Sequence, residues 1–431
     1  MAKSIFKELI GKYFSKIAKY FYDKINGSKE EPKYLHDQML DEEYSADMTY
    51  ESISGNFTRI TADVVSFDSP APIKTRGSFK RASGDITKMA LKFLLTEKQM
   101  NTIRILSKDE GRKKELIKKI FNDTEACIVG IKEKIEQAHL LGFSGGVTLI
   151  EDDKNVGTGI RIDYNIPKGN QFGAVTKWSD DDAKPIDDIK RIKRNAMHSG
   201  EYPNTIWMDS YIVDKLLNNA QVKELFAFNL NFVGTNVPML SEEQLKSVFK
   251  TNLKLDLMVV DRTFVHEKDG KRTVSQGWTP NMVVFTTGVK VGALVYSTLA
   301  EEEFQQESVE YAKPNSYILI KKDGTTDPVS EKTAGEALVI PVLQNVESLF
   351  YLNVEEAEAS EDTQTEGDAV YTYKEVNYTK QSVVDGINAG RTVDDGIAEA
   401  KITNADSTLA NKIDKLSEEG IALFEAELVA V

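Results

Sequence analysis

Five aspartates fall within the fourteen residues "TKWSDDDAKPIDDI", Thr176 to Ile189. Carboxylates at this density are typical of a calcium loop, a magnesium-dependent phosphotransferase or an acid/base pair. A calcium loop would alternate its ligands as D-x-[DN]-x-[DN]-G and place a glutamate at position twelve. Counted from Asp180, position twelve is Arg191, and the first three aspartates are consecutive. The calcium pattern therefore fails.

The same stretch follows the sequence rules for the start of a helix. Asp180–Asp182 offer turn or capping oxygens to unpaired backbone N–H groups. Pro185 suits the first helical turn, and Asp187 and Asp188 favour the positive end of the helix dipole. The segment "IDDIKRIKRNAMHSG" then runs from acids to bases and closes at Gly200. We predict that these carboxylates build a helix.

Other catalytic templates are incomplete. The segment "GFSGG" (Gly142–Gly146) matches G-x-S-x-G around Ser144, but a hydrolase elbow needs a strand before the serine and a helix after it. Here a predicted helix comes first, so we interpret the glycines as its C-cap. The four histidines are scattered, without H-E-x-x-H, a cysteine cluster or a phosphate-binding loop. The sequence predicts no catalytic residue, metal site or cofactor; an enzyme using Ser144 or the aspartates is the weaker alternative.

Composition and charge limit the class of protein. The chain has 431 residues, of which 41% are hydrophobic and 28% charged, and a formal net charge of −14. Its length predicts two or three packed units, and its negative balance excludes a whole-chain basic surface for nucleic acid. The single cysteine, Cys127, cannot form an internal disulfide, and no apolar run approaches the roughly 18 residues that span a bilayer. We predict a soluble intracellular protein with no membrane partner.

The N-terminal segment "KSIFKELIGKYFSKIAKYFYDKI" predicts a basic amphipathic helix. Its apolar stripe includes Phe6, Ile10, Phe14, Ile17 and Phe21. Such a helix can lie on a membrane or bind a partner groove. The stripe is too apolar to stay exposed, so we expect it to dock on a neighbouring subunit or core, and of these we favour a neighbouring subunit. The polar, acidic segment Ser28–Ser54 is interpreted as an extended arm.

Residues further along predict a strand, a basic loop and a long helix. The alternating Phe57–Phe67 predicts a strand, and Asp68–Asp85, with two prolines and two glycines, predicts a long hairpin loop with a basic tip. The basic residues of this loop are Lys74, Arg76, Lys80 and Arg81, followed by Lys88. Asp109–Leu141 predicts the strongest helix, whose stripe is Leu116, Ile120, Cys127, Ile131, Ile135 and Ala138. Cys127 on this stripe is interpreted as packing, and Lys118, Lys119, Lys132, Glu133 and Lys134 lie off the stripe.

The order of several segments resembles a known family. After Asp163-Tyr164 and Pro167 come "WSDDDAKPIDDI" (Trp178–Ile189), "PNTIWMDSYIVDKLLNNAQVKELF" (Pro203–Phe226) and "WTPNMVVFTTGVKVGALVYSTLAEEE" (Trp278–Glu303). This order is similar to that of the major capsid proteins of tailed bacteriophages, in the lambda head-protein family (capsid protein E). The resemblance covers roughly residues 57–353, and no single motif in it is diagnostic.

The resemblance implies an α+β chain with the Hong Kong 97-type phage capsid fold. It divides the chain into an N-terminal helix and arm (1–55), an extended E-loop region (56–105), a peripheral domain with a spine helix (106–165) and an axial domain (166–310), followed by a return to the peripheral domain (311–353). Within the axial domain, Asp269-Gly270 predicts a hairpin. Residues 354–431 fall outside the family pattern. They begin with the acidic linker "VEEAEASEDTQTEGD" and predict a small, mostly helical appendage that contains the loose repeat "SVVDGINAG" and "TVDDGIAEA".

The implied function is that of a major capsid protein, which forms hexamers and pentamers of an icosahedral shell around the phage genome. An encapsulin-like compartment shell of the same fold is the alternative. The implied partners are other copies of the chain, a portal, a scaffold or decoration protein, and packaged double-stranded DNA bound non-specifically. The protein would be located in the virion capsid, after assembly in the host cytoplasm. We expect the basic loop to contact acidic surface on the adjacent subunit, with a solvated loop as the alternative.

Overall fold

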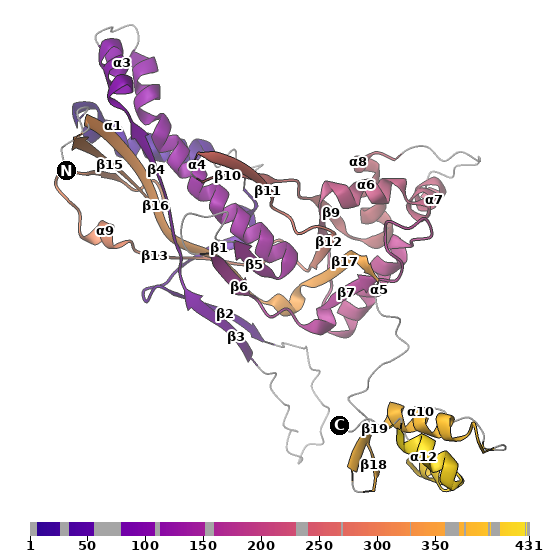
Figure 1. Cartoon of the computed structure of the whole chain (residues 1–431). Coiled ribbons are helices and arrows are strands. Elements are labelled where there is room, and N and C mark those ends of the chain that lie inside the picture. Colours follow the sequence, from indigo (N-terminus) through magenta and orange to yellow (C-terminus); the bar gives the residue numbers. More distant parts are fainter. Residues whose placement is uncertain are drawn as a thin grey trace, which may run out of the picture. The chain divides into compact units, whose positions relative to one another are not determined.

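The structure, a computed structural model, describes residues 7–25, 34–55, 79–107, 113–150, 159–229, 240–268, 270–327, 329–357, 370–374, 376–394, 397, 406–426 and 428. The chain forms two compact units, Met1–Glu358 and Ala359–Val431 (Figure 1). The described part of the first unit contains two hydrophobic cores, and the second unit has a small core of its own. The α+β class predicted from the sequence is confirmed.

The first sheet is built around one long strand. Its six strands are β1 (Leu40–Tyr44), β4 (Lys88–Leu95), β13 (Gly292–Ser297), β14 (Glu310–Ala312), β15 (Ile318–Thr326) and β16 (Val329–Leu343). β16 pairs antiparallel with β4, β13 and β15, while β1 runs parallel to β13 at the edge. α4 (Lys113–Gly145) crosses this sheet, and Gly335 of β16 permits the close approach, since a Cβ there would lie 2.8 Å from the Cβ of Cys127.

The second sheet carries a group of helices. Its strands, in spatial order, are β7 (Gln171–Ala174), β17 (Phe350–Ala357), β12 (Met282–Thr286), β8 (Thr205–Met208) and β9 (Asp256–Val259). The associated helices are α5 (Pro185–His198), α6 (Ser210–Asn218), α7 (Ala220–Asn229) and α8 (Glu242–Val248). Their apolar faces bury Ile189, Leu216 and Phe226 together with Phe285 and Phe350 of the sheet. This second core is separate from the one beneath α4.

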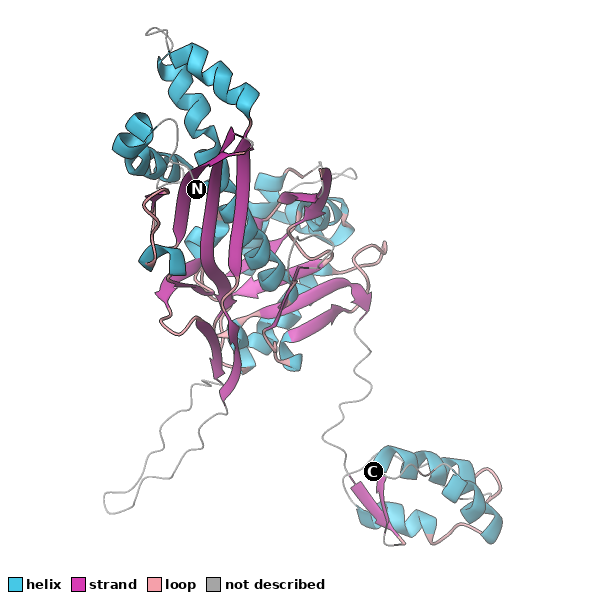
Figure 2. Cartoon of the chain, turned by 60° about the vertical axis from the view of Figure 1, so that its left-hand side comes forward, coloured by secondary structure: helices cyan, strands magenta, loops and turns pink. Residues whose placement is uncertain are grey.

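Among the described residues of the first unit, three two-stranded hairpins accompany the two sheets. They are β2 (Thr49–Gly55) with β3 (Phe79–Asp85), β5 (Val147–Ile150) with β6 (Ile160–Asp163), and β10 (Thr263–Lys268) with β11 (Lys271–Gln276). The hairpin predicted at Gly270 is confirmed, because Gly270 has a φ of +74° and Lys268 pairs with Lys271. The β2–β3 hairpin projects from the body of the unit (Figure 2). The remaining helices are α1 (Lys7–Ile25), α2 (Leu35–Met39), α3 (Glu97–Ser107) and α9 (Ala300–Glu303).

The long helix predicted at Asp109–Leu141 is confirmed as α4. Cys127, Ile131, Ile135 and Ala138 are all buried, while the side chains of Leu116 and Ile120 are outside the described part of the chain. Burial raises the pKa of the Cys127 thiol to about 12, so the thiol stays protonated and acts as a packing group. Ser144 is also buried and donates a hydrogen bond to the Leu140 carbonyl at 2.7 Å, and Gly146 ends the helix with a φ of +69°.

The aspartate-rich segment does form a turn and a helix start, but its oxygens act differently from the prediction. The N-cap of α5 is Lys184, which makes no side-chain capping bond, and Asp180 contributes its backbone carbonyl to Ala183. Asp188 is buried, and its carboxylate accepts hydrogen bonds from the Trp178 indole at 3.0 Å and from the Val175 backbone at 3.2 Å. This carboxylate therefore ties the preceding loop to α5. Gly200, with a φ of +82°, closes the helix as predicted.

The interpretation of Ser28–Ser54 as an extended arm is wrong for the described residues 34–54. They form α2, β1 and most of β2, and Tyr34 and Met39 are fully buried. Sequence periodicity missed them because each element is very short and β1 is an edge strand whose Asp41, Glu42 and Glu43 face solvent. Parallel pairing with β13, about 250 residues away, supplies the order that local sequence does not.

Other predicted boundaries also shift. The strand predicted at Phe57–Phe67 lies outside the described residues, and the strand that pairs with β3 is β2. β13, within the range predicted as axial, belongs to the first sheet, whereas β17 belongs to the second sheet and extends to Ala357. Val354, predicted to begin a solvated linker, is fully buried because it continues β17.

The second unit is mostly helical, as predicted, with one added hairpin. Its elements are β18 (Val370–Tyr373), β19 (Val376–Thr379), α10 (Lys380–Gly390), α11 (Asp406–Ile413) and α12 (Glu418–Ala426). Phe424 lies at its centre, fully buried, with its ring edge-on to Tyr373 at 5.1 Å. "SVVDGINAG" lies on α10, whereas "TVDDGIAEA" begins in the turn that follows it, so the two phrases start in different structures.

Candidate functional site

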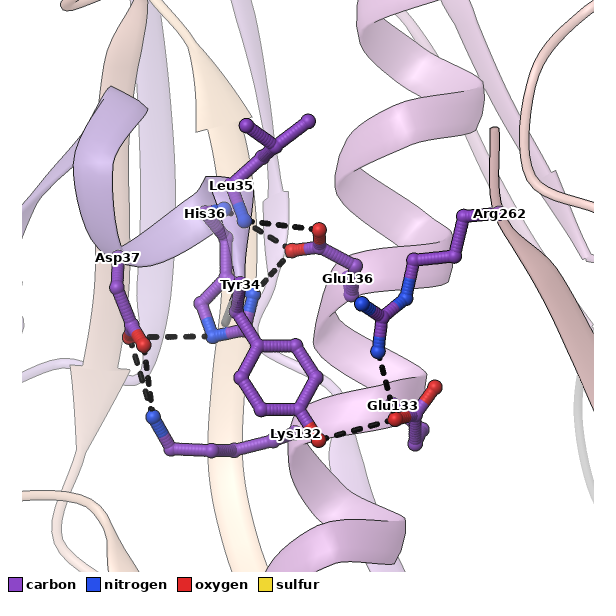
Figure 3. Close-up of polar contacts among 8 residues, drawn as sticks. All are labelled: Tyr34, Leu35, His36, Asp37, Lys132, Glu133, Glu136 and Arg262. Atoms are coloured by element: carbon purple, nitrogen blue, oxygen red, sulfur yellow. Dashed lines mark hydrogen bonds and ion pairs between the residues drawn. The ribbon is translucent and has the colours of Figure 1, made fainter. Parts of the chain in front are cut away.

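Three charged side chains on α4 gather distant parts of the chain around one stretch of the helix, beside His139. Lys132, Glu133, Glu136 and His139 lie on neighbouring turns of α4. The first three bind the short segment Tyr34–Asp37, and Glu133 also binds Arg262, which immediately precedes β10 (Figure 3). Eight residues make up what we call the clasp, which joins three segments that are far apart in sequence: Tyr34, Leu35, His36, Asp37, Lys132, Glu133, Glu136 and Arg262.

The Glu136 carboxylate is the centre of the clasp. One oxygen accepts the backbone N–H of Leu35 at 2.8 Å, and the other accepts the backbone N–H of His36 at 2.9 Å and lies 2.6 Å from His36 Nδ1. These two backbone groups are at the start of α2, where N–H donors have no partner within the helix. Glu136 therefore caps α2 from another helix (Figure 3).

Burial and neighbouring charges have opposite effects on the pKa of Glu136 and on the pKa of His139. Burial raises the pKa of Glu136, but the hydrogen bonds and charge of His36, with the charge of His139, hold that pKa at about 2. Burial lowers the pKa of His139 to about 4, against the opposing effect of Glu136. Neither ring nitrogen of His139 has a hydrogen-bond partner in the described part of the chain, and the ring stacks on Phe143. At neutral pH, Glu136 is charged and His139 is neutral.

Lys132 is fully buried, which contradicts its predicted place on the charged face of the helix. Its ammonium donates to both oxygens of Asp37, at 3.2 and 2.9 Å. It also lies 4.7 Å from the ring centre of Tyr22 and 5.2 Å from that of Tyr34, within range of cation–π attraction. A carboxylate and two aromatic faces thus replace the water that the ammonium loses on burial.

Glu133 connects the clasp to the β10–β11 hairpin. Its Oε1 accepts a hydrogen bond from the Tyr34 hydroxyl at 2.9 Å and one from Arg262 Nη2 at 2.7 Å. The guanidinium of Arg262 lies 4.7 Å from the Tyr34 ring centre. Burial, followed by the charge of Glu133, raises the pKa of the Tyr34 hydroxyl, so the hydroxyl stays protonated and can donate this hydrogen bond.

The clasp has the chemistry of a structural junction. Its charges are buried or partly buried and paired with one another, and among its residues no accessible nucleophile lies beside a base. Across the described residues, no three His, Cys, Asp or Glu side chains are grouped so that they could hold a metal ion. Within the same ranges, every helix falls short of the length or apolarity needed to cross a bilayer.

The comparison with known families decides what kind of protein this is. Residues 21–354 match the family described as phage major capsid protein E. The chain belongs to this family. The resemblance drawn from the sequence is thereby confirmed, together with the Hong Kong 97-type capsid fold and the major capsid function that it implied. Proteins of this kind assemble into the shell of the virion, so this capsid protein is a structural protein.

Solved structures similar to this capsid protein include two from bacterial genomes. A putative prophage capsid protein of E. coli CFT073 is 15% identical, with a TM-score of 0.49, and the match covers 79% of this chain and 98% of that chain. A phage-related protein of Bordetella bronchiseptica RB50 is 11% identical, with a TM-score of 0.42 and coverage of 79% and 97%.

The SrpI encapsulin of Synechococcus elongatus PCC 7942 is also similar, at 8% identity and a TM-score of 0.37, with 74% and 87% covered. A search of the curated proteins found no match.

The predicted contact residues of the capsid protein fall in different places. Lys80 and Arg81 lie on strand β3 instead of in a loop, because the hairpin begins earlier in the chain than predicted, while Lys74 and Arg76 are outside the described residues. Phe14 is buried in the core of its own subunit, and Ile17 and Phe21 pack against that core. These three residues therefore lie in or against the core of their own subunit, and the favoured contact of the stripe with a neighbouring subunit stays a prediction. Phe6 and the side chain of Ile10 are outside the described part.

The clasp was missed by sequence reasoning. Lys132, Glu136 and His139 recur at spacings of four and three residues, which places them on one side of α4. A row of ionisable residues at this spacing usually marks a solvated face, so the pattern alone argues against burial. A usable signal was the position of Glu136 and His139 directly beside Ile135 and Ala138 of the apolar stripe.

Proposed function

We propose that copies of this capsid protein form hexamers and pentamers of an icosahedral shell, and that the β2–β3 hairpin is the arm by which each copy contacts its neighbour. The observation that supports this is the hairpin itself. Its two strands pair with each other and with no third strand in the described part of the chain. A two-stranded ribbon is marginally stable alone in water, so a projecting one is expected to gain order from a partner.

The basic residues of this arm are the proposed contact points. Lys80 and Arg81 lie on β3, and Lys74 and Arg76 precede it in the sequence. A chain with a net charge of −14 has many carboxylates that could receive these cations on a neighbouring copy. Charge pairs across such an interface set register and partner choice more than they add affinity.

The two sheets of the first unit correspond, in this proposal, to the two domains of the family. The first sheet with α4 is the peripheral domain, and it includes β13. The second sheet with α5 to α8 is the axial domain around the hexamer and pentamer centres, and it includes β17. The shell encloses double-stranded DNA without sequence preference and joins a portal, with a scaffold or decoration protein as further partners. Assembly takes place in the host cytoplasm.

The test is a charge-removal variant of the arm. We expect the variant with Lys74, Arg76, Lys80 and Arg81 all changed to Ser to lower the yield of closed shells about tenfold, while the free chain keeps its thermal stability. A matched control changes four exposed bases on the second-sheet side to Ser: Lys177, Lys190, Arg194 and Lys250. Sedimentation and electron microscopy measure the shells. Equal yields from the two variants would contradict the proposed role of the arm.

A further inference from the structure

The root of the β2–β3 hairpin is attached to the body of the subunit. Tyr50 and Ser52 occupy alternate positions of β2, so their side chains share one face of the strand. Both are buried, at 7% and 3% exposure, while Glu51 between them is exposed. The inward face of the root thus belongs to the body of the subunit.

The first attachment is a ring packed over a glycine. Tyr50 pairs with Gly84 of β3, and a Cβ built on Gly84 would lie 3.0 Å from both the Cε1 and the hydroxyl oxygen of Tyr50. The Tyr50 ring belongs to the core beneath α4. Gly84 lets the ring pack closely against β3, because a Cβ there would displace the ring by a few tenths of an ångström.

The second attachment is a hydrogen bond to the end of the central strand. Ser52 Oγ donates to the backbone carbonyl of Leu343, the last residue of β16, at 2.5 Å. Behind the hairpin, the Ile86 N–H donates to the Met48 carbonyl at 2.8 Å and closes its base. Thr87 then joins the edge of β16 through Val339, whose N–H donates to the Thr87 carbonyl at 3.1 Å.

Two separate attachments to the body of the subunit can fix the direction of the hairpin, which a single attachment cannot do. A ribbon held at a single point can pivot about it, whereas the burial of Tyr50 in the core and the Ser52 bond to Leu343 constrain its direction as well as its position. We propose that Tyr50, Ser52 and Gly84 are positioning residues that fix the direction in which the hairpin leaves the subunit, and hence the shape of the shell. This inference rests on the proposed role of the hairpin as the arm between copies.

The direction can be measured in the unassembled full-length chain. Spin labels at Ser83→Cys and Glu97→Cys, both exposed positions, report the distance between β3 and α3, while native Cys127 is fully buried and stays unlabelled. We expect Ser52→Ala and Gly84→Ala to broaden the distance distribution about twofold and to give shells of mixed diameter. Ser52→Thr, which keeps the hydroxyl, and Tyr50→Phe, which keeps the ring, should match the original chain in both measurements.

The outcomes separate this inference from the proposed function. If Ser52→Ala gives the original distance distribution and shells of uniform diameter, these residues serve only stability and the inference is overturned. If Ser52→Ala gives mixed shells while the four-Ser variant of the basic residues assembles normally, the positioning role is supported and the charge contact fails. If the four-Ser variant alone loses assembly, the charge contact is supported and the positioning role is overturned.

Discussion

His36 Nδ1 lies 2.6 Å from Glu136 Oε2, and the same carboxylate oxygen accepts the backbone N–H of His36 at 2.9 Å. A side chain and a main chain of one residue therefore converge on a single buried oxygen. Through this contact the segment that precedes β1 is held to α4, and β1 in turn completes one edge of the first sheet. The stability of this end of the subunit should depend on the charge of Glu136.

Glu136→Gln should lower the free energy of unfolding of the Met1–Glu358 unit by about 3 kcal/mol. The amide keeps the shape of the carboxylate but has a single acceptor oxygen. In the original chain, the backbone N–H groups of Leu35 and His36 use both oxygens of Glu136. Thermal unfolding at pH 7 measures the effect. Glu125→Gln on the same helix is the control, because Glu125 is partly exposed and its pairing with Lys24 contributes little. Equal losses of unfolding free energy in the two variants would show that Glu136 stabilises the unit no more than a partly exposed carboxylate does.

Acid should destabilise the first unit in two steps. The pKa of His139 is lowered to about 4, so between its ordinary value of 6.5 and 4 the unfolded chain binds a proton that the folded chain does not. Stability is therefore lost as pH falls through that window. The pKa of Glu136 is lowered to about 2, so its contribution, present above 4.5, is lost between 4.5 and 2.

A single substitution separates the two steps. His139→Phe should remove the loss between pH 6.5 and 4, on the order of 3 kcal/mol, and leave the lower step in place. The cost at pH 7 should be small, since the His139 ring nitrogens have no partner in the described chain and the ring lies beside Phe143. Unfolding curves from pH 7.5 to 3 test this. An unchanged upper step in the variant would assign that step to another group.

Gly335→Ala should destabilise the first unit by about 1–3 kcal/mol. The added methyl group would lie 2.8 Å from the Cβ of Cys127, and 3.2 and 3.3 Å from the Cδ1 atoms of Ile320 and Ile131, so α4 would have to move away from β16. Gly288→Ala is the matched control, because a Cβ there meets nothing within 4 Å. Thermal unfolding of both variants measures the difference. A stable Gly335→Ala chain would mean that the helix is not held against the sheet as described.

Phe424→Ala should destabilise the Ala359–Val431 unit by about 3–5 kcal/mol and leave the first unit unchanged. Phe424 is fully buried in a core that contains no residue of the first unit. Calorimetry of the full chain should therefore show two transitions, of which only one shifts. Ile421→Ala, at the partly buried margin of the same core, should shift that transition less. A shift of both transitions would show that the units unfold together.

The amino-acid sequence by itself determined the features that depend on near neighbours. The stripe through Cys127, Ile131 and Ile135 identified α4 because helical periodicity is a local property. The turn at Gly270 and the end of α5 at Gly200 followed from the need for positive φ. The order of segments was also enough to identify the family, since order survives when single motifs do not.

Only the tertiary structure decided where the charges are and which strands meet. Lys132 and Glu136 have the spacing of a solvated helix face, yet Asp37 and His36 arrive from about 100 residues away and permit their burial. The pairing of β1 with β13 and of β17 with β12 likewise depends on contacts between distant segments, which a local sequence pattern cannot predict. A buried charge and a strand pairing are both properties of two segments together. The sequence of either segment alone therefore does not determine whether its charge is buried or which strand it pairs with.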